Sequence, residues 1–99
     1  MEEQEITTYF LEHPDQYAFV KDEELVRFLQ NLSRQALTED EINFLYKKRT
    51  KEIMQACFDL HFIEKIMVAG VARYFVTQEA KLFLEEREKL KKSFGIFEA

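Results

Sequence analysis

The chain has 99 residues, with 19 acidic and 14 basic side chains and a formal charge of −5, which suits one small domain spanning residues 1–99. Ten Phe and four Tyr beside only two Gly and one Pro exclude a disordered chain, a collagen-like repeat and a turn-rich all-β fold. A single cysteine forms no internal disulfide, and no apolar run approaches the ~20 residues that span a bilayer. We therefore expect a cytoplasmic protein without a membrane partner.

Two helices are expected in the first third of the chain. The first covers about residues 2–13 and ends at Pro14, because proline lacks the amide proton and disfavours helix before it. Residues 17–21 are expected to be extended or a loop. The second helix covers about residues 23–32, with Asp22 as its N-cap and an apolar stripe on one face.

A third helix is predicted to start at a capping box formed by Thr38 and Glu41, with Ile42 and Leu45 facing inward. Four basic residues within positions 47–51 then interrupt the apolar periodicity. Two interpretations follow from this interruption. One long helix runs from about residue 39 to 60, or the basic stretch contains a break, with a helix ending near Tyr46 and another starting near Arg49.

The pattern changes after residue 60. Two β-branched and aromatic runs, residues 62–68 and 73–77, read as a hairpin around a tip at residues 69–72. Thr77 is expected to cap a last helix at about residues 78–94. The inner stripe of that helix consists of Ala80, Phe83, Leu84, Arg87, Leu90 and Phe94. The predicted fold class is therefore mainly α with a small β-hairpin (α+β).

The order helix, helix, helix, hairpin, helix resembles that of the winged helix-turn-helix family. The resemblance is most specific over residues 53–80, IMQACFDLHFIEKIMVAGVARYFVTQEA, where FIEKI followed by a short turn and RYFVT is similar to the wing strands of that family. Two features depart from the family pattern. His61 and Ala80 stand where many members have glycine, and the wing tip, residues 68–72, carries no charge.

The resemblance implies a sequence-specific, DNA-binding transcription regulator without cofactor or enzymatic activity. In this family the helix before the wing meets base edges while basic side chains hold phosphates. If that helix starts near Arg49, its leading turn offers Lys47, Lys48, Arg49 and Lys51 to phosphates, with Gln55 nearest the bases and Lys65 and Arg73 flanking the wing. If it starts at Thr38, carboxylates at positions 39–41 would face the DNA instead.

The charge is unevenly distributed along the chain. Residues 1–46 hold eleven acidic and three basic side chains (net −8), whereas residues 47–99 hold eleven basic and eight acidic ones (net +3). A local basic cluster binds phosphate at short range even in an acidic protein, because salt screens distant charges. The cluster also has a second interpretation, a solvated helix face in which Lys48 and Lys51 pair with Glu41 or Glu52.

Other activities find less support in the sequence. The two histidines lie far apart, no Cys or His spacing suits a metal, and no glycine-rich loop is present to hold a phosphate group. The alternative to DNA binding is a winged-helix module for protein–protein interaction, with the uncharged wing tip against a partner. We also expect a homodimer, formed by the terminal helices at about residues 2–13 and 78–94, with Phe83, Leu90, Phe94 and Phe97 in the interface.

Overall fold

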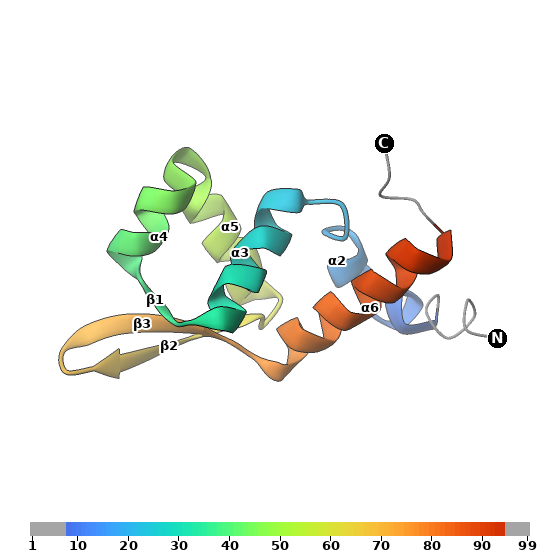
Figure 1. Cartoon of the computed structure of the whole chain (residues 1–99). Helices are drawn as coiled ribbons and strands as arrows, with labels where there is room; N and C mark the ends of the chain where they lie inside the picture. Colours follow the sequence, from blue (N-terminus) through green and yellow to red (C-terminus); the bar gives the residue numbers. More distant parts are fainter. Residues whose placement is uncertain (1–7, 95–99) are drawn as a thin grey trace.

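The chain folds as an α+β structure in which helices precede a β-hairpin and a C-terminal helix (Figure 1). A computed structural model of the chain describes residues 8–94. A helical segment at residues 8–12 is followed by α2 (Pro14–Tyr17), α3 (Glu23–Arg34), β1 (Leu37–Thr38), α4 (Glu39–Tyr46), the 3-10 turn η1 (Lys47–Arg49), α5 (Thr50–Asp59), β2 (Ile63–Val68), β3 (Val71–Val76) and α6 (Gln78–Phe94). The predicted fold class and the predicted order of the main helices and the hairpin are confirmed.

Helix α3 lies at the centre of the core. Its apolar stripe, including Leu25, Phe28 and Leu29, is fully buried, and it packs with residues of α5 and α6 in one cluster. The side chain of Asp22 caps this helix by accepting a hydrogen bond from the Leu25 amide at 3.1 Å, as predicted. The helix continues two residues beyond its predicted end, to Arg34.

The segment before α3 differs from its prediction. The first helical segment does end before Pro14, but Pro14 also begins the one-turn helix α2, and turn residues 18–21 follow it. Proline suits the first position of a helix because its fixed φ is already helical. An amide proton at that position would have no acceptor within the helix, so proline loses no hydrogen bond there. Residues 17–21 are therefore the end of a helical turn and a turn, not an extended segment.

The two helices on either side of the basic stretch are separate, which decides between the two interpretations of residues 39–60. Helix α4 ends at Tyr46, and Lys47 has φ 49° and ψ −113°, a conformation that favours glycine. Helix α5 then starts at Thr50. The capping box is present, because Thr38 Oγ1 accepts from the Glu41 amide at 3.3 Å and the Thr38 amide donates to Glu41 Oε1 at 2.8 Å.

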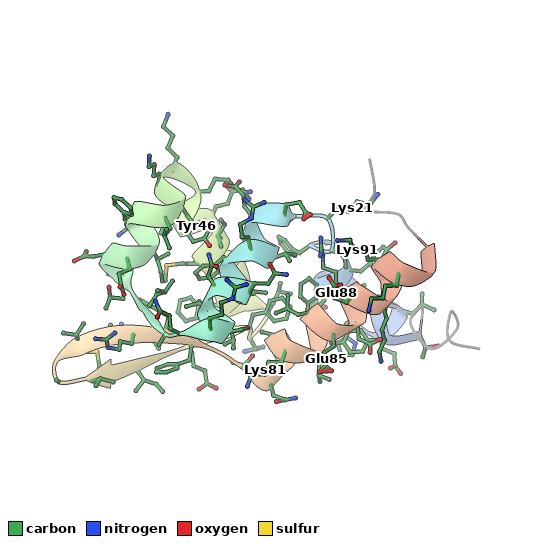
Figure 2. All side chains as sticks on the ribbon, viewed as in Figure 1. Lys21, Tyr46, Lys81, Glu85, Glu88 and Lys91 are labelled. Atoms are coloured by element: carbon green, nitrogen blue, oxygen red, sulfur yellow. The ribbon has the colours of Figure 1, made fainter. Side chains whose placement is uncertain are left out.

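The inward face of α4 is narrower than predicted. Ile42 is fully buried, but Leu45 is 51% exposed and does not face the core. Instead Tyr46 turns toward α3, where its hydroxyl accepts a hydrogen bond from Asn31 Nδ2 at 2.8 Å (Figure 2). Residues four positions apart lie on one helix face, so Ile42 and Tyr46 together define the side of α4 that packs.

The hairpin belongs to a three-stranded antiparallel sheet of order β1-β3-β2. The sequence predicts only the two strands of the hairpin. Strand β1 has two residues, too few to show the alternation of apolar and polar side chains that indicates a strand. Its register places Leu37 opposite Tyr74 and Thr38 opposite Arg73. The hairpin turn is shorter than predicted, since Ala69 and Gly70 alone adopt positive φ and β3 starts at Val71.

Helix α6 starts as the sequence predicts. Thr77 Oγ1 accepts from the Ala80 amide at 3.2 Å and donates to the His61 carbonyl at 2.6 Å. His61, just after α5, has φ 58°, a left-handed conformation that glycine adopts more easily. Helix α6 and the segment at residues 8–12 lie at one end of the molecule, and the hairpin tip lies at the opposite end (Figure 1).

Candidate nucleic-acid interface

Three lysines gather where α4 gives way to α5. Lys47 and Lys48 lie in η1, Lys51 lies in the first turn of α5, and all three side chains are exposed. Within residues 8–94, none of the ion pairs involves any of these lysines, so the alternative pairing of Lys48 and Lys51 with Glu41 or Glu52 is not formed. We call this cluster, Lys47, Lys48 and Lys51, the basic corner.

Arg49 lies within the same stretch but has a different environment. Its Nη1 is 2.7 Å from Glu24 Oε1, and its Nη2 is 3.3 Å from Asp22 Oδ2 and 3.4 Å from Glu52 Oε1. Hydrogen bonds that Arg49 donates to Glu24 and, to a smaller extent, to Asp22 raise the pKa of its guanidinium above the ordinary value. Its charge is compensated by carboxylates within the chain, so we leave Arg49 out of the basic corner.

Gln55, the predicted base-reading residue, is exposed on the same side of α5 as Lys51, four residues earlier. Its Nε2 donates a hydrogen bond to Asp59 Oδ1 at 2.9 Å. Gln55 also lines an open groove of about 560 Å³ between α5 and the segment around α2. The groove is formed by Asp15, Ala18, Phe19, Glu52, Gln55, Ala56, Asp59 and Leu60, so carboxylates flank Gln55.

The two cations of the hairpin lie on opposite faces of the sheet. Lys65 pairs with Tyr74 and Ile66 pairs with Arg73, and side chains of directly paired residues share a face. The face of the sheet that carries Tyr74 is turned toward α5, because the centre of the Tyr74 ring lies 6.0 Å from the centre of the Phe58 ring, and Phe58 belongs to α5. Only Lys65 therefore lies on the side of the sheet that α5 occupies.

Arg73 lies beside the start of α4. Its register partner Thr38 caps that helix, and the Arg73 charge contributes to a lowered pKa of Glu41, after two larger contributions from hydrogen bonds with Thr38. Arg73 is half-buried, whereas Lys65 is exposed. The structure thus brings Lys47, Lys48 and Lys51 together and separates Arg73 from them.

Exposed apolar side chains occur on both sides of this region. The hairpin tip exposes Ile66, Met67, Val68 and Val71 by 45–59% of their surfaces. On α4, Phe44 is 78% exposed. Sequence reasoning did not single out Phe44, although its position two residues after the buried Ile42 places it on the outward face of the helix.

Two of the predicted dimer-interface residues, Phe83 and Leu90 of α6, pack inside the chain. Phe83 is fully buried with its ring 4.9 Å from that of Phe62, and Leu90 is 6% exposed. The inner stripe of α6 was correctly predicted, but its buried residues pack into the core of the same chain. Phe97 and the side chain of Phe94 lie outside the residues that the structure describes.

Residues 8–94 offer few groups for metal binding, membrane insertion or thiol chemistry. Residues 8–94 contain no group of three His, Cys, Asp or Glu side chains arranged as metal ligands, and none of their helices has the length and apolarity needed to cross a membrane. Cys57 is buried in the core, where desolvation and, to a smaller extent, the charge of Asp22 raise the pKa of its thiol to about 12. Cys57 therefore contributes a buried, neutral side chain to the core at ordinary pH.

No protein-family model, no curated protein and no solved structure matches this chain.

Proposed function

We propose that this chain is a winged-helix protein that binds double-stranded DNA and regulates transcription without catalysing a reaction. The observation that carries the proposal is the basic corner, three exposed lysines at the start of the helix that precedes the hairpin. Lysines without carboxylate partners are available for phosphates, and the start of α5 adds the positive end of a helix dipole. Lys65 supplies a further exposed cation on the hairpin face that is turned toward α5.

Sequence readout would depend on Gln55. The Gln55 side chain is oriented by its hydrogen bond to Asp59 and lies between the carboxylates of Glu52 and Asp59. These carboxylates would repel the DNA phosphates next to any base that Gln55 contacts. Selectivity for a base through Gln55 requires its amide to exchange the Asp59 contact for a base edge. Backbone contacts from the basic corner do not depend on that exchange.

A titration of labelled random-sequence duplex at low salt tests the proposal. Three lysines that each neutralise one phosphate give a slope of log K against log salt of about −3. Replacing Lys47→Glu together with Lys48→Glu should abolish binding, measured by fluorescence anisotropy. The matched control is Lys91→Glu with Lys92→Glu, the same charge change on α6, away from the junction of α4 and α5 (Figure 2). Absence of binding at micromolar protein, or equal losses in both double variants, would contradict the proposal.

The second candidate function is a winged-helix module for protein–protein interaction. It is favoured by the hairpin tip, whose four exposed apolar side chains have no cation among them. Met67→Lys, a substitution at an exposed residue on the same hairpin face as Lys65, separates the two functions. A wing that lies against DNA should then bind duplex more tightly and with a steeper salt dependence, whereas a wing that serves a protein partner should leave duplex affinity unchanged.

A further inference from the structure

Phe44 is the most exposed large hydrophobic side chain of the described residues, at 78%. It stands on α4 opposite the buried Ile42, and within residues 8–94 its ring contacts no other aromatic ring. A phenylalanine in this position adds no burial to the core. Its neighbour Leu45 is also 51% exposed, so the end of α4 presents an apolar surface to solvent.

This apolar surface directly adjoins the basic corner. Lys47 and Lys48 follow Phe44 by three and four residues, in the turn directly after α4 ends at Tyr46, and Lys51 lies in the first turn of α5. The nearby carboxylates of Asp22, Glu24 and Glu52 are engaged by Arg49, which leaves the charges of the three lysines uncompensated. The fold also holds Lys47 in a backbone conformation that favours glycine, at φ 49°. A flat apolar ring and three free cations therefore share one corner of the molecule.

The chemistry that matches such a corner combines negative charges with a flat apolar surface. Phosphates can form ion pairs with the lysines, and the face of a nucleobase can stack on the phenylalanine ring. Single-stranded nucleic acid offers both groups and is therefore complementary to both parts of the corner. In a continuous duplex the faces of the bases are covered by their neighbours, so Phe44 finds no partner there. An unpaired base at an end, an overhang or a melted segment exposes the face that the ring needs.

An anionic membrane is less complementary to this corner. A flat lipid surface that touched Phe44 would also approach the first turn of α4, where Glu39, Asp40 and Glu41 are all exposed. Those carboxylates repel anionic headgroups. A flexible strand, in contrast, can cross the corner without lying along the whole of α4.

We propose that the basic corner and Phe44 together bind nucleic acid with unpaired bases, the ring stacking on one base while Lys47, Lys48 and Lys51 hold adjacent phosphates. This inference rests on the proposed DNA-binding function and names its substrate class: single-stranded DNA, or a duplex with a single-stranded overhang. Phe44 acts as the residue that separates these substrates from blunt duplex.

The affinities of three labelled probes test the inference. These are a 16-nucleotide single strand of mixed sequence, the corresponding blunt duplex and the same duplex with a six-nucleotide overhang, at one low salt concentration. The single strand and the overhang should bind more tightly than the blunt duplex. Phe44→Ala should weaken binding of the single strand about tenfold and binding of the blunt duplex less than about twofold, whereas Phe44→Tyr should retain the affinity. Leu11→Ala, at another exposed apolar residue (73%), is the matched control.

A spectroscopic measurement reports on the stacking itself. The chain has no Trp, so Phe44→Trp introduces a single tryptophan reporter at the proposed contact. Stacking on a base should quench its emission when the single strand is added. Anionic phospholipid vesicles should leave the emission unchanged.

The possible outcomes separate this inference from the proposed function. Duplex binding that is lost on Lys47→Glu with Lys48→Glu, but without dependence on Phe44 or quenching of the Phe44→Trp variant, overturns the inference and leaves the proposed function standing. A blue shift with anionic vesicles and no response to the single strand also overturns the inference. No binding of any of the three probes overturns both. Far-UV circular dichroism of each variant confirms that it is folded.

Discussion

At the residue scale, the two arginines Arg49 and Arg87 stabilise the fold while the lysines of the basic corner remain exposed. Arg49 joins η1 to the start of α3 through Asp22 and Glu24. Arg87 is an inner residue of α6, with only 4% of its side chain exposed. Because a guanidinium offers five donors in a fixed plane, it can bind several acceptors of the protein at once, which an ammonium group does less well.

Arg87 joins α6 to the segment that enters α3, and its removal should destabilise the chain. Its Nε donates to the Val20 carbonyl at 2.6 Å, and its Nη2 donates to both carboxylate oxygens of Glu23 at 3.1 Å. Arg87→Met keeps the aliphatic volume but leaves that carbonyl without its charged donor, so we expect the free energy of unfolding to fall by about 2 kcal/mol. Urea denaturation followed by circular dichroism measures this change.

Glu23→Gln is the control for the ion pair alone. The Glu23 side chain is 61% exposed, so loss of its charge should lower the free energy of unfolding by less than about 1 kcal/mol. A larger effect of Glu23→Gln than of Arg87→Met would show that the bond to Val20 contributes little.

At the element scale, short elements account for most of the differences between prediction and structure. The longer helices α3 and α6 were recognisable from caps and apolar stripes, which are local signals within a few residues. Helix α2 and strand β1 have four and two residues, too few for a period to emerge. Strand β1 forms because Leu37 is held opposite Tyr74 of β3, a contact between residues distant in the sequence.

The junction between α4 and α5 should be strained at Lys47. Because the φ of 49° there favours glycine, Lys47→Gly should raise the free energy of unfolding by about 1 kcal/mol while it weakens DNA binding. Lys48→Gly is the control, since it removes the same charge from a residue in helical conformation and should lower the free energy of unfolding by about 0.5–1 kcal/mol. Thermal or urea denaturation of both variants, beside the duplex titration, checks this. Destabilisation by Lys47→Gly would contradict the assignment of strain.

At the scale of the whole molecule, the two ends have different surfaces. The hairpin, α4 and the basic corner lie toward one end, and α6 extends to the other (Figure 1). Phe83 and Leu90 of α6 are buried in the core, so the homodimer, which we retain as a proposal, would not be formed by these two side chains. Sedimentation at two protein concentrations measures whether two copies associate.

The core as a whole should make the protein less stable in alkali. The Cys57 thiol has a pKa of about 12 in the folded chain against an ordinary value of 9.0, and burial also raises the pKa values of Tyr9, Tyr46 and Tyr74. Below pH 9 the thiol is neutral in both the folded and the unfolded chain. Above it the unfolded chain loses this proton first, so the free energy of unfolding should fall as the pH rises from about 9 toward 12.

Urea denaturation at a series of pH values from 7 to above 9 measures this dependence, and Cys57→Ala identifies the contribution of the thiol. The variant should have a lower stability at neutral pH because it loses buried volume, but a shallower decline in alkali. Parallel declines in the two proteins would assign the pH dependence to the tyrosines.

The sequence alone determined the fold class, the capping box, the N-caps and the order of the main elements, because these depend on interactions within about one helical turn or across a short hairpin. It also located the lysines of the basic corner. Only the tertiary structure decided which of the basic side chains have carboxylate partners and which are exposed without one. Arg49 meets carboxylates from 25 and 27 residues earlier, sheet register separates Lys65 from Arg73, and packing of α6 buries Phe83 and Leu90. Each of these outcomes depends on which distant segments come together, and no local pattern records that.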